Sequence, residues 1–283
     1  MIKIDLNYQI KEDIGFILTI EDIDVLELSL MTGISRNTLN KVLATGIAQN
    51  DTCEKFYSFI YKNKYRFNLV KEEFLKEINP LILFHGSKNG LQSIFFDGSK
   101  ENADFGKGFY LGETFNQALS FVCENENSTV YSFKFDTTDL NICKLECNLD
   151  WMLIICYYRG YLSAYKDNII LIELIKKIEN ADVIIAPIAD NKMFYIMSQF
   201  ADGDINTEVA IHSLSASSLG NQYVIKSEKA LKHLKSIEKY FLSKEERIES
   251  RNKILERSYA VETKLKLAKR EFREGKYIEE VFK

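Results

Sequence analysis

The spacing of apolar residues divides the chain into three parts. Up to about residue 77, apolar positions recur three to four residues apart, which is typical of amphipathic helices. From about 78 to 235, short apolar runs that suit strands alternate with helical patterns, and residues 236–283 form a highly charged stretch without proline. We therefore predict an α+β protein with a helical domain over 1–77, a mixed α/β domain over 78–235 and a charged helical extension over 236–283.

In the first part, the pattern predicts a helix from Glu21 to Leu30. Ile23, Leu26 and Leu30 would form its inner face, and Thr19 followed by Asp22 resembles a capping box. We expect this helix to be the first of the domain.

A glycine-containing turn over 32–35 follows, and Ser35 is a suitable N-cap for a second helix over residues 36–44 that ends at Gly46. A third helix from about Asp51 to Lys62 would complete the domain. Helix, turn and helix in this order are typical of the helix-turn-helix motif, and the string LSLMTGISRNTLNKVLATG resembles phage-repressor-like DNA-binding domains.

The charge of the first part leaves its partner open between DNA and protein. The second helix offers exposed polar side chains for base edges or phosphates: Arg36, Asn37, Asn40 and Lys41. However, residues 1–76 carry 10 Lys and Arg against 11 Asp and Glu, which is a poor balance for neutralising phosphates. A helical docking or dimerisation module is the alternative.

Towards the C-terminus, the pattern predicts one more strand and then helix. The run ADVIIAPIAD indicates a buried central strand, although Pro187 within it favours an edge or a bulge, and NQYVIKS would be the last strand. Residues 228–241 would continue as a helix into the extension, where residues 232–283 hold 15 Lys and Arg against 10 Asp and Glu. This helix either packs against the body with a solvated outer face or binds nucleic acid.

Composition excludes several classes of protein. The chain has three His and five Cys, none in a CxxC pair, which argues against an all-His metal cage, a zinc ribbon and a disulfide scaffold, so we expect no metal site. The net charge of −4 gives no overall attraction to nucleic acid. The start has no secretory leader and no long apolar window is present, so we expect a cytoplasmic protein without a membrane segment.

Three separated segments of the middle part carry candidate chemistry: LFHGS over 83–87, FGKGFYL over 105–111 and NQYVI over 221–225. In this order and spacing they resemble the three motifs of ADP-ribosyltransferases of the diphtheria-toxin and poly(ADP-ribose) polymerase branch. The resemblance extends to a bacterial toxin-associated family of unknown function with the same pattern, and it covers roughly residues 80–236. It implies a split mixed β-sheet core that binds NAD as a substrate.

The chemistry of NAD cleavage fits these residue types. Loss of nicotinamide passes through an oxocarbenium-like ribose, so the site must hold the nicotinamide amide and support positive charge at the anomeric carbon. By the resemblance, His85 would bond ribose hydroxyls, the Gly86 backbone would pair with the carboxamide, and Tyr110 and Phe121 would stack on nicotinamide. Ser87 and Gly106 would support the pocket.

The third motif departs from the pattern of the resembled family. Gln222 stands where that family has Glu, and an amide keeps its hydrogen bonds but cannot accept a proton. Single transfer is therefore favoured over chain elongation, and the acid could come from Glu228, Glu208 or Asp190 instead. Asp104, just before the glycine-rich turn, is interpreted as shaping that loop.

The function expected from this reasoning is a toxin-type mono-ADP-ribosyltransferase, with His85, Tyr110 and Gln222 as catalytic residues. It would transfer ADP-ribose from NAD to a protein or nucleic-acid acceptor, and the flanking helices would recognise the target or an antitoxin. Three alternatives stay open: an NAD glycohydrolase, a helix-turn-helix regulator that senses a nucleotide, and an inactive binding scaffold.

Overall fold

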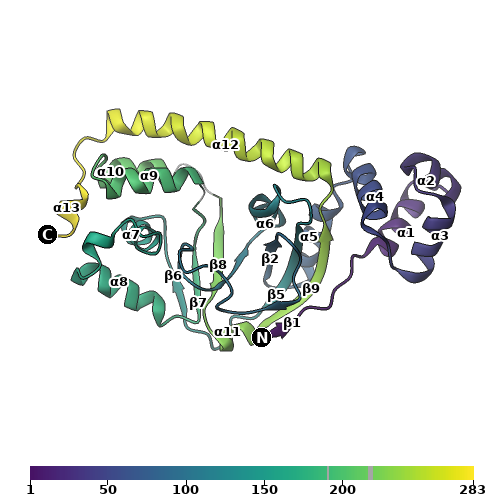
Figure 1. Cartoon of the computed structure of the whole chain (residues 1–283), viewed down its shortest axis with the longest axis horizontal. Helices are drawn as coiled ribbons and strands as arrows, with labels where there is room; N and C mark the ends of the chain where they lie inside the picture. The colour runs from purple at the N-terminus through teal and green to yellow at the C-terminus, as the bar shows by residue number, and fades with distance from the viewer. Residues whose placement is uncertain (190, 216–218) are drawn as a thin grey trace.

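The structure is a computed structural model that describes residues 1–189, 191–215 and 219–283, and it is a mixed α+β protein (Figure 1). Its main sheet has the strand order β6-β7-β8-β4-β2-β5-β9, and β1 pairs with β3 in a separate two-stranded sheet. Strands β6 and β7 are parallel, and the other neighbours are antiparallel. The strands are β1 Ile2–Lys3, β2 Ile82–Ser87, β3 Ser93–Ile94, β4 Phe109–Gly112, β5 Thr129–Phe135, β6 Ile142–Lys144, β7 Val183–Pro187, β8 Asn221–Ile225 and β9 Leu234–Phe241.

The helices lie at one end of the sheet and against its faces (Figure 1). They are α1 Ile10–Ile20, α2 Val25–Thr32, α3 Arg36–Thr45, α4 Asn50–Lys62, α5 Phe67–Ile78, α6 Phe115–Val122, α7 Leu149–Tyr158, α8 Ile169–Glu179, α9 Asn191–Ala201, α10 Thr207–Ser215, α11 Glu228–Lys232, α12 Lys244–Glu271 and α13 Ile278–Val281, with a 3-10 turn over Ser163–Tyr165.

The main sheet separates between β2 and β4. Within the described residues these two strands pair at Phe84 and Gly112 alone, whereas β2 pairs with β5, and β4 with β8, over their whole lengths. We call the opening beyond the Phe84–Gly112 pair the split; residues 85–87 border it on β2 and residues 109–111 on β4. The sheet therefore consists of two halves joined at one residue pair.

One hydrophobic cluster, with Leu83 of β2, Phe109 of β4 and Ile225 of β8, extends across both halves, whereas two further clusters each belong to one half. Helix α6 packs with β2, β5 and β9 in one cluster, and helices α7 to α10 pack with β7 and β8 in another. Helix α12 runs across both halves, from α4 and α6 to α9 and α10 (Figure 1). Its buried residues lie near its start, up to Ser250, and then from Val261 onward; none between 251 and 260 is buried. Helix α12 thus contacts helices of both halves, in addition to the hydrophobic cluster that the halves share.

The N-terminal helices follow the predicted helix-turn-helix with one correction. Ser35 accepts from the Thr38 N–H and caps α3, and α3 ends at Gly46 in the left-handed conformation, as predicted. The helix expected over 21–30 is present, but it begins later, as α2 at Val25, because Asp24 and Glu27 form a capping box there. Helix α1, Ile10–Ile20, lies before it and was not predicted.

The residues of α2 that face inward also differ from the prediction. Leu28 is buried, whereas Leu26 is 47% exposed and Leu30 is 77% exposed. Thr19 lies inside α1, where its hydroxyl donates to the Gly15 carbonyl rather than capping a helix. Leu26 and Leu30 share one face of α2 and Leu28 lies on another, and packing against α3 and α4 buries the face with Leu28.

The C-terminal boundary is also corrected. Residues 228–241 are not one helix: α11 ends at Lys232, and β9 follows as an edge strand of the sheet. The helical extension therefore begins at Lys244 and not at 236. Strand β9 pairs with β5 from Leu234 to Phe241, and the pairing with β5 outweighs a local sequence that favours helix.

Strand β7 lies between β6 and β8, so the central position is confirmed and the edge position suggested by Pro187 is wrong. Pro187 is the last residue of β7, where a missing N–H costs the ladder little.

Candidate functional site

His85 lies at the split and reaches across it. Its Nδ1 lies 2.7 Å from the carbonyl oxygen of Tyr110 on β4, and its ring stacks on Phe109 with centroids 4.5 Å apart. Since a carbonyl can only accept, Nδ1 carries the proton and Nε2 is the acceptor. Burial lowers the pKa of His85 from its ordinary value of 6.5, which favours this neutral form. Nε2 has no hydrogen-bond partner in the described part of the chain, so it can accept from a ligand hydroxyl.

Gly86 brings backbone groups to the split. The Leu81 carbonyl accepts from the Phe135 N–H on β5, and the direction of these bonds alternates along an antiparallel strand. The N–H and C=O of Gly86 therefore face β4, beyond the point where the ladder ends. A Cβ at Gly86 would lie 2.4 Å from the Ala118 carbonyl oxygen, so only glycine allows α6 to approach this closely.

Ser87 is the last residue of the first motif and stabilises the turn that follows β2. Its hydroxyl donates to the Gly90 carbonyl at 2.8 Å, and the side chain is buried. This contact agrees with the supporting role that the resemblance implies, since the Ser87 hydroxyl bonds the turn.

Tyr110 is anchored by the loop that precedes it. Its hydroxyl donates to the Gly106 carbonyl at 2.7 Å and accepts from the Phe105 N–H at 3.0 Å. Burial raises the pKa of Tyr110 above its ordinary value, so the phenol stays protonated. Gly106 has φ +70°, and a Cβ there would lie 2.7 Å from the Tyr158 ring. The second motif therefore fixes Tyr110 through the conformation of a glycine.

Gln222 is buried on β8 and bonds a carboxylate from the second motif. Its Nε2 donates to Asp104 Oδ2 at 3.1 Å and to the Pro187 carbonyl at 3.2 Å. Asp104 is also buried, and its Oδ1 accepts from Nε and Nη2 of Arg159 at 3.2 and 2.5 Å. Burial raises the pKa of Asp104, and the bonds from Arg159 and Gln222 oppose that shift.

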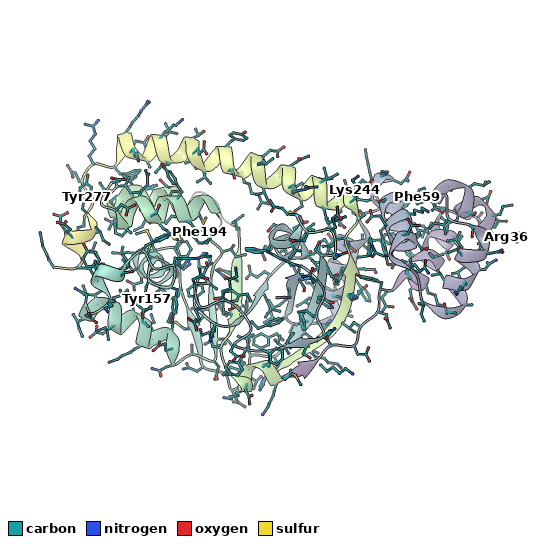
Figure 2. The ribbon with its side chains drawn as sticks, viewed as in Figure 1. Arg36, Phe59, Tyr157, Phe194, Lys244 and Tyr277 are labelled. Atoms are coloured by element: carbon teal, nitrogen blue, oxygen red, sulfur yellow. The ribbon has the colours of Figure 1, made fainter. Side chains whose placement is uncertain are left out.

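Sequence reasoning missed Arg159 and underestimated Asp104. The Arg159 guanidinium lies 3.9 Å from the centroid of the Phe194 ring, which extends inward from α9 (Figure 2). Nothing in the local sequence connects Asp104 and Arg159 with Gln222. The one available signal was that a carboxylate directly preceded the glycine-rich turn.

Of the three carboxylates proposed to replace the missing Glu, the two that the structure describes form no hydrogen bond with Gln222 within the described residues. Glu228 and Glu208 are exposed, on α11 and α10, and Asp190 lies outside the described residues. A different carboxylate, Glu113, lies next to Gln222: it accepts from the N–H and Nδ2 of Asn221 at 2.8 and 3.1 Å. In the third motif, Glu113 thus accepts from the Asn221 amide and Asp104 accepts from the Gln222 amide.

Phe121 lies on α6 and is 59% exposed. Among the described residues, no ring contact joins it to Tyr110. Its stacking on a ligand therefore stays a prediction.

The candidate DNA-contacting residues of α3 are exposed: Arg36, Asn37, Asn40 and Lys41. Arg36 lies at the outer end of the molecule (Figure 2). Beside α3, apolar side chains are also exposed, with Leu30 at 77% and Ile47 at 72%. This surface offers both polar and apolar contacts, so the two interpretations of the domain stay open.

A cavity of about 560 Å³ lies away from the three motifs, between α4, α5, α6 and α12. Glu246 of α12 lines it and is buried, with Oε2 accepting from Asn68 at 2.9 Å. Burial raises the pKa of Glu246 to about 8. Arg66, Glu249 and Lys253 also line this cavity and form ion pairs there.

Comparison with known proteins places the region that contains all three motifs in one family. The model of the family described as "Protein of unknown function (DUF3990)" matches residues 81–236. The chain belongs to this family. The DUF3990 match runs from the residue before β2 into β9, so it includes the whole split and excludes the helix-turn-helix and α12. No curated protein and no solved structure matches the chain.

Two further observations concern the described residues as a whole. No helix among residues 1–189, 191–215 and 219–283 is long and apolar enough to cross a membrane. Nor does that part of the chain contain a group of three His, Cys, Asp or Glu side chains placed to hold a metal ion.

Proposed function

We propose that this DUF3990 protein is an ADP-ribosyltransferase that cleaves NAD and transfers a single ADP-ribose to a macromolecule. The main support is the opening of the sheet between β2 and β4, which brings the three motifs to one place: His85 and Gly86 on one side, Tyr110 on the other, and Gln222 on the strand next to Tyr110. This arrangement fits the split mixed β-sheet that the resemblance implies.

Each group has a task that its geometry allows. The free N–H and C=O of Gly86 match the two hydrogen-bonding groups of the nicotinamide amide, and the Nε2 of His85 is an acceptor for a ribose hydroxyl. Tyr110 offers an aromatic ring whose hydroxyl is already held by the loop. These groups would hold NAD with its reacting bond fixed before the acceptor arrives.

The reaction needs little acid–base chemistry. The bond between the anomeric carbon and nicotinamide breaks, and its electron pair stays on the departing ring, which leaves neutral. The acceptor's nucleophilic atom forms the new bond to the anomeric carbon, and any proton on it passes to solvent. Gln222, which cannot act as a base, is compatible with this single transfer.

The test is incubation of the full chain with NAD labelled on the adenylate and a cell lysate, followed by separate protease and nuclease digestion. Label that survives nuclease but not protease identifies a protein acceptor, and the reverse identifies nucleic acid. Free ADP-ribose without labelled acceptor would support the glycohydrolase instead. Absence of any NAD turnover would refute both enzymes.

A further inference from the structure

We propose that Asp104 is a positioning residue that fixes which end of the Gln222 amide faces the substrate. An amide side chain has a donor end and an acceptor end, and either can point into a site. Here the two acceptors on Nε2, Asp104 Oδ2 and the Pro187 carbonyl, both require the donor end. Oε1 is left as the free end, without a partner in the described part of the chain. The inference rests on the proposed function.

Arg159 makes this orientation rigid. Its guanidinium binds Asp104 Oδ1 through two N–H groups and packs on the Phe194 ring. Asp104 therefore has one oxygen held by Arg159 and one that accepts from Gln222. A carboxylate cannot donate, so the Gln222 amide cannot turn over without losing the bond to Asp104.

The consequence concerns the role of the Glu that Gln222 replaces. A carboxylate at this position would accept from a ribose hydroxyl, and Gln222 accepts in the same way only if Oε1 faces NAD. Asp104 supplies that condition from the loop before β4. The protein would thereby keep a hydrogen-bond acceptor for the ribose hydroxyl at position 222 without the negative charge of a Glu carboxylate.

The experiment exchanges the carboxylate at position 104 and the amide at position 222, first singly and then together. In Asp104→Asn, the new amide gives its oxygen to Arg159, so its N–H faces the Nε2 of Gln222. Gln222 then either turns over, which sets Oε1 against the Pro187 carbonyl, or keeps two donors facing each other, and in both cases the fixed orientation is lost. We expect kcat for NAD cleavage to fall ~10- to 100-fold, the range for losing one hydrogen bond in the transition state, with a smaller change in KM. Gln222→Glu alone sets two carboxylates against each other and should also lose activity at neutral pH.

The double variant Asp104→Asn/Gln222→Glu restores a donor opposite an acceptor between positions 104 and 222 but loses the bond to the Pro187 carbonyl, so it should recover part of the activity that each single variant loses. Asp182→Asn is the matched control, because Asp182 also accepts from a side chain of the segment after β8, Ser227, but at the opposite end of the strand. This control should retain turnover.

A second measurement does not depend on catalysis. The side-chain amide protons of Gln222, assigned by their loss in Gln222→Glu, should exchange slowly with water in the native chain and faster in Asp104→Asn. Native turnover with undiminished kcat in Asp104→Asn would overturn the inference, and so would a failure of the folded double variant to recover. If the native chain does not cleave NAD, the proposed function fails, and amide exchange still decides the orientation.

Discussion

The imidazole of His85 on β2 donates to the backbone carbonyl of Tyr110 on β4 across 2.7 Å, at the place where the two strands no longer pair. A side chain thus takes the position of a ladder hydrogen bond. The contact fixes the tautomer of His85 and leaves Nε2 as an acceptor at the split.

His85→Ala should reduce NAD cleavage at least 100-fold, because both the ribose contact and the bridge to β4 are lost. The proposed function requires the neutral imidazole as the acceptor for a ribose hydroxyl, and burial lowers the pKa of His85 below 6.5. We therefore expect kcat/KM to stay level from pH 8 down to 6.5 and to fall only at lower pH. His233→Ala, which alters an exposed histidine, is the control for a pH-rate series.

Gly86→Ala should both destabilise the protein and abolish NAD cleavage. Its Cβ would lie 2.4 Å from a backbone oxygen of α6, and such overpacking costs about 1–3 kcal/mol. Gly15→Ala is the matched control, since a Cβ there meets nothing within 4 Å, and an alanine inside α1 should be neutral or stabilising by up to about 1 kcal/mol. Urea unfolding of both variants checks the difference; equal stabilities would contradict the contact with α6.

Tyr110→Phe keeps the ring but leaves the Phe105 N–H without its partner and the Gly106 carbonyl with the Ser99 hydroxyl alone. We expect a loss of about 1–3 kcal/mol in stability and a higher KM for NAD, because the glycine-rich loop is no longer held. Tyr195→Phe changes an exposed tyrosine and should alter neither quantity. Thermal unfolding measures the loss of stability, and steady-state kinetics measure KM for NAD. An unchanged KM would show that the Tyr110 hydroxyl does not hold the loop in its binding conformation.

Phe121→Ala separates stacking from folding. The ring is 59% exposed, so its removal should leave the melting temperature within a degree or two of the native value, on the order of the effect of an ordinary surface substitution. If Phe121 stacks on nicotinamide, KM for NAD rises about tenfold, in the range of an aromatic contact. An unchanged KM would remove this residue from the site.

Glu246 should make the stability depend on pH. Its pKa is about 8 in the folded protein and near 4.5 when unfolded, so the folded state holds the extra proton between these values. This contribution to stability is fully present below pH 4.5 and is lost as the pH rises towards 8, by an amount on the order of a few kcal/mol. Denaturant unfolding should give a lower free energy of unfolding at pH 8 than at pH 5.5, and Glu246→Gln should remove this difference. Glu256→Gln, which changes an exposed residue of the same helix, should leave the difference unchanged.

The amino-acid sequence determined the features that depend on near neighbours. Ser35 and Gly46 set the ends of α3 because caps act within one turn. The three motifs likewise appeared as strand ends and a glycine-rich turn, since each is a contiguous segment. The predicted NAD contacts remain predictions.

Tertiary structure decided what depends on partners far along the chain. Residues 234–241 have a helical pattern but form β9, because β5 offers a ladder for them. The bond between Asp104 and Gln222 joins residues 118 positions apart, and no spacing in the sequence encodes it. Burial then sets the ionisation of Asp104, His85 and Glu246, because desolvation depends on what the fold places around a side chain and not on the residue itself.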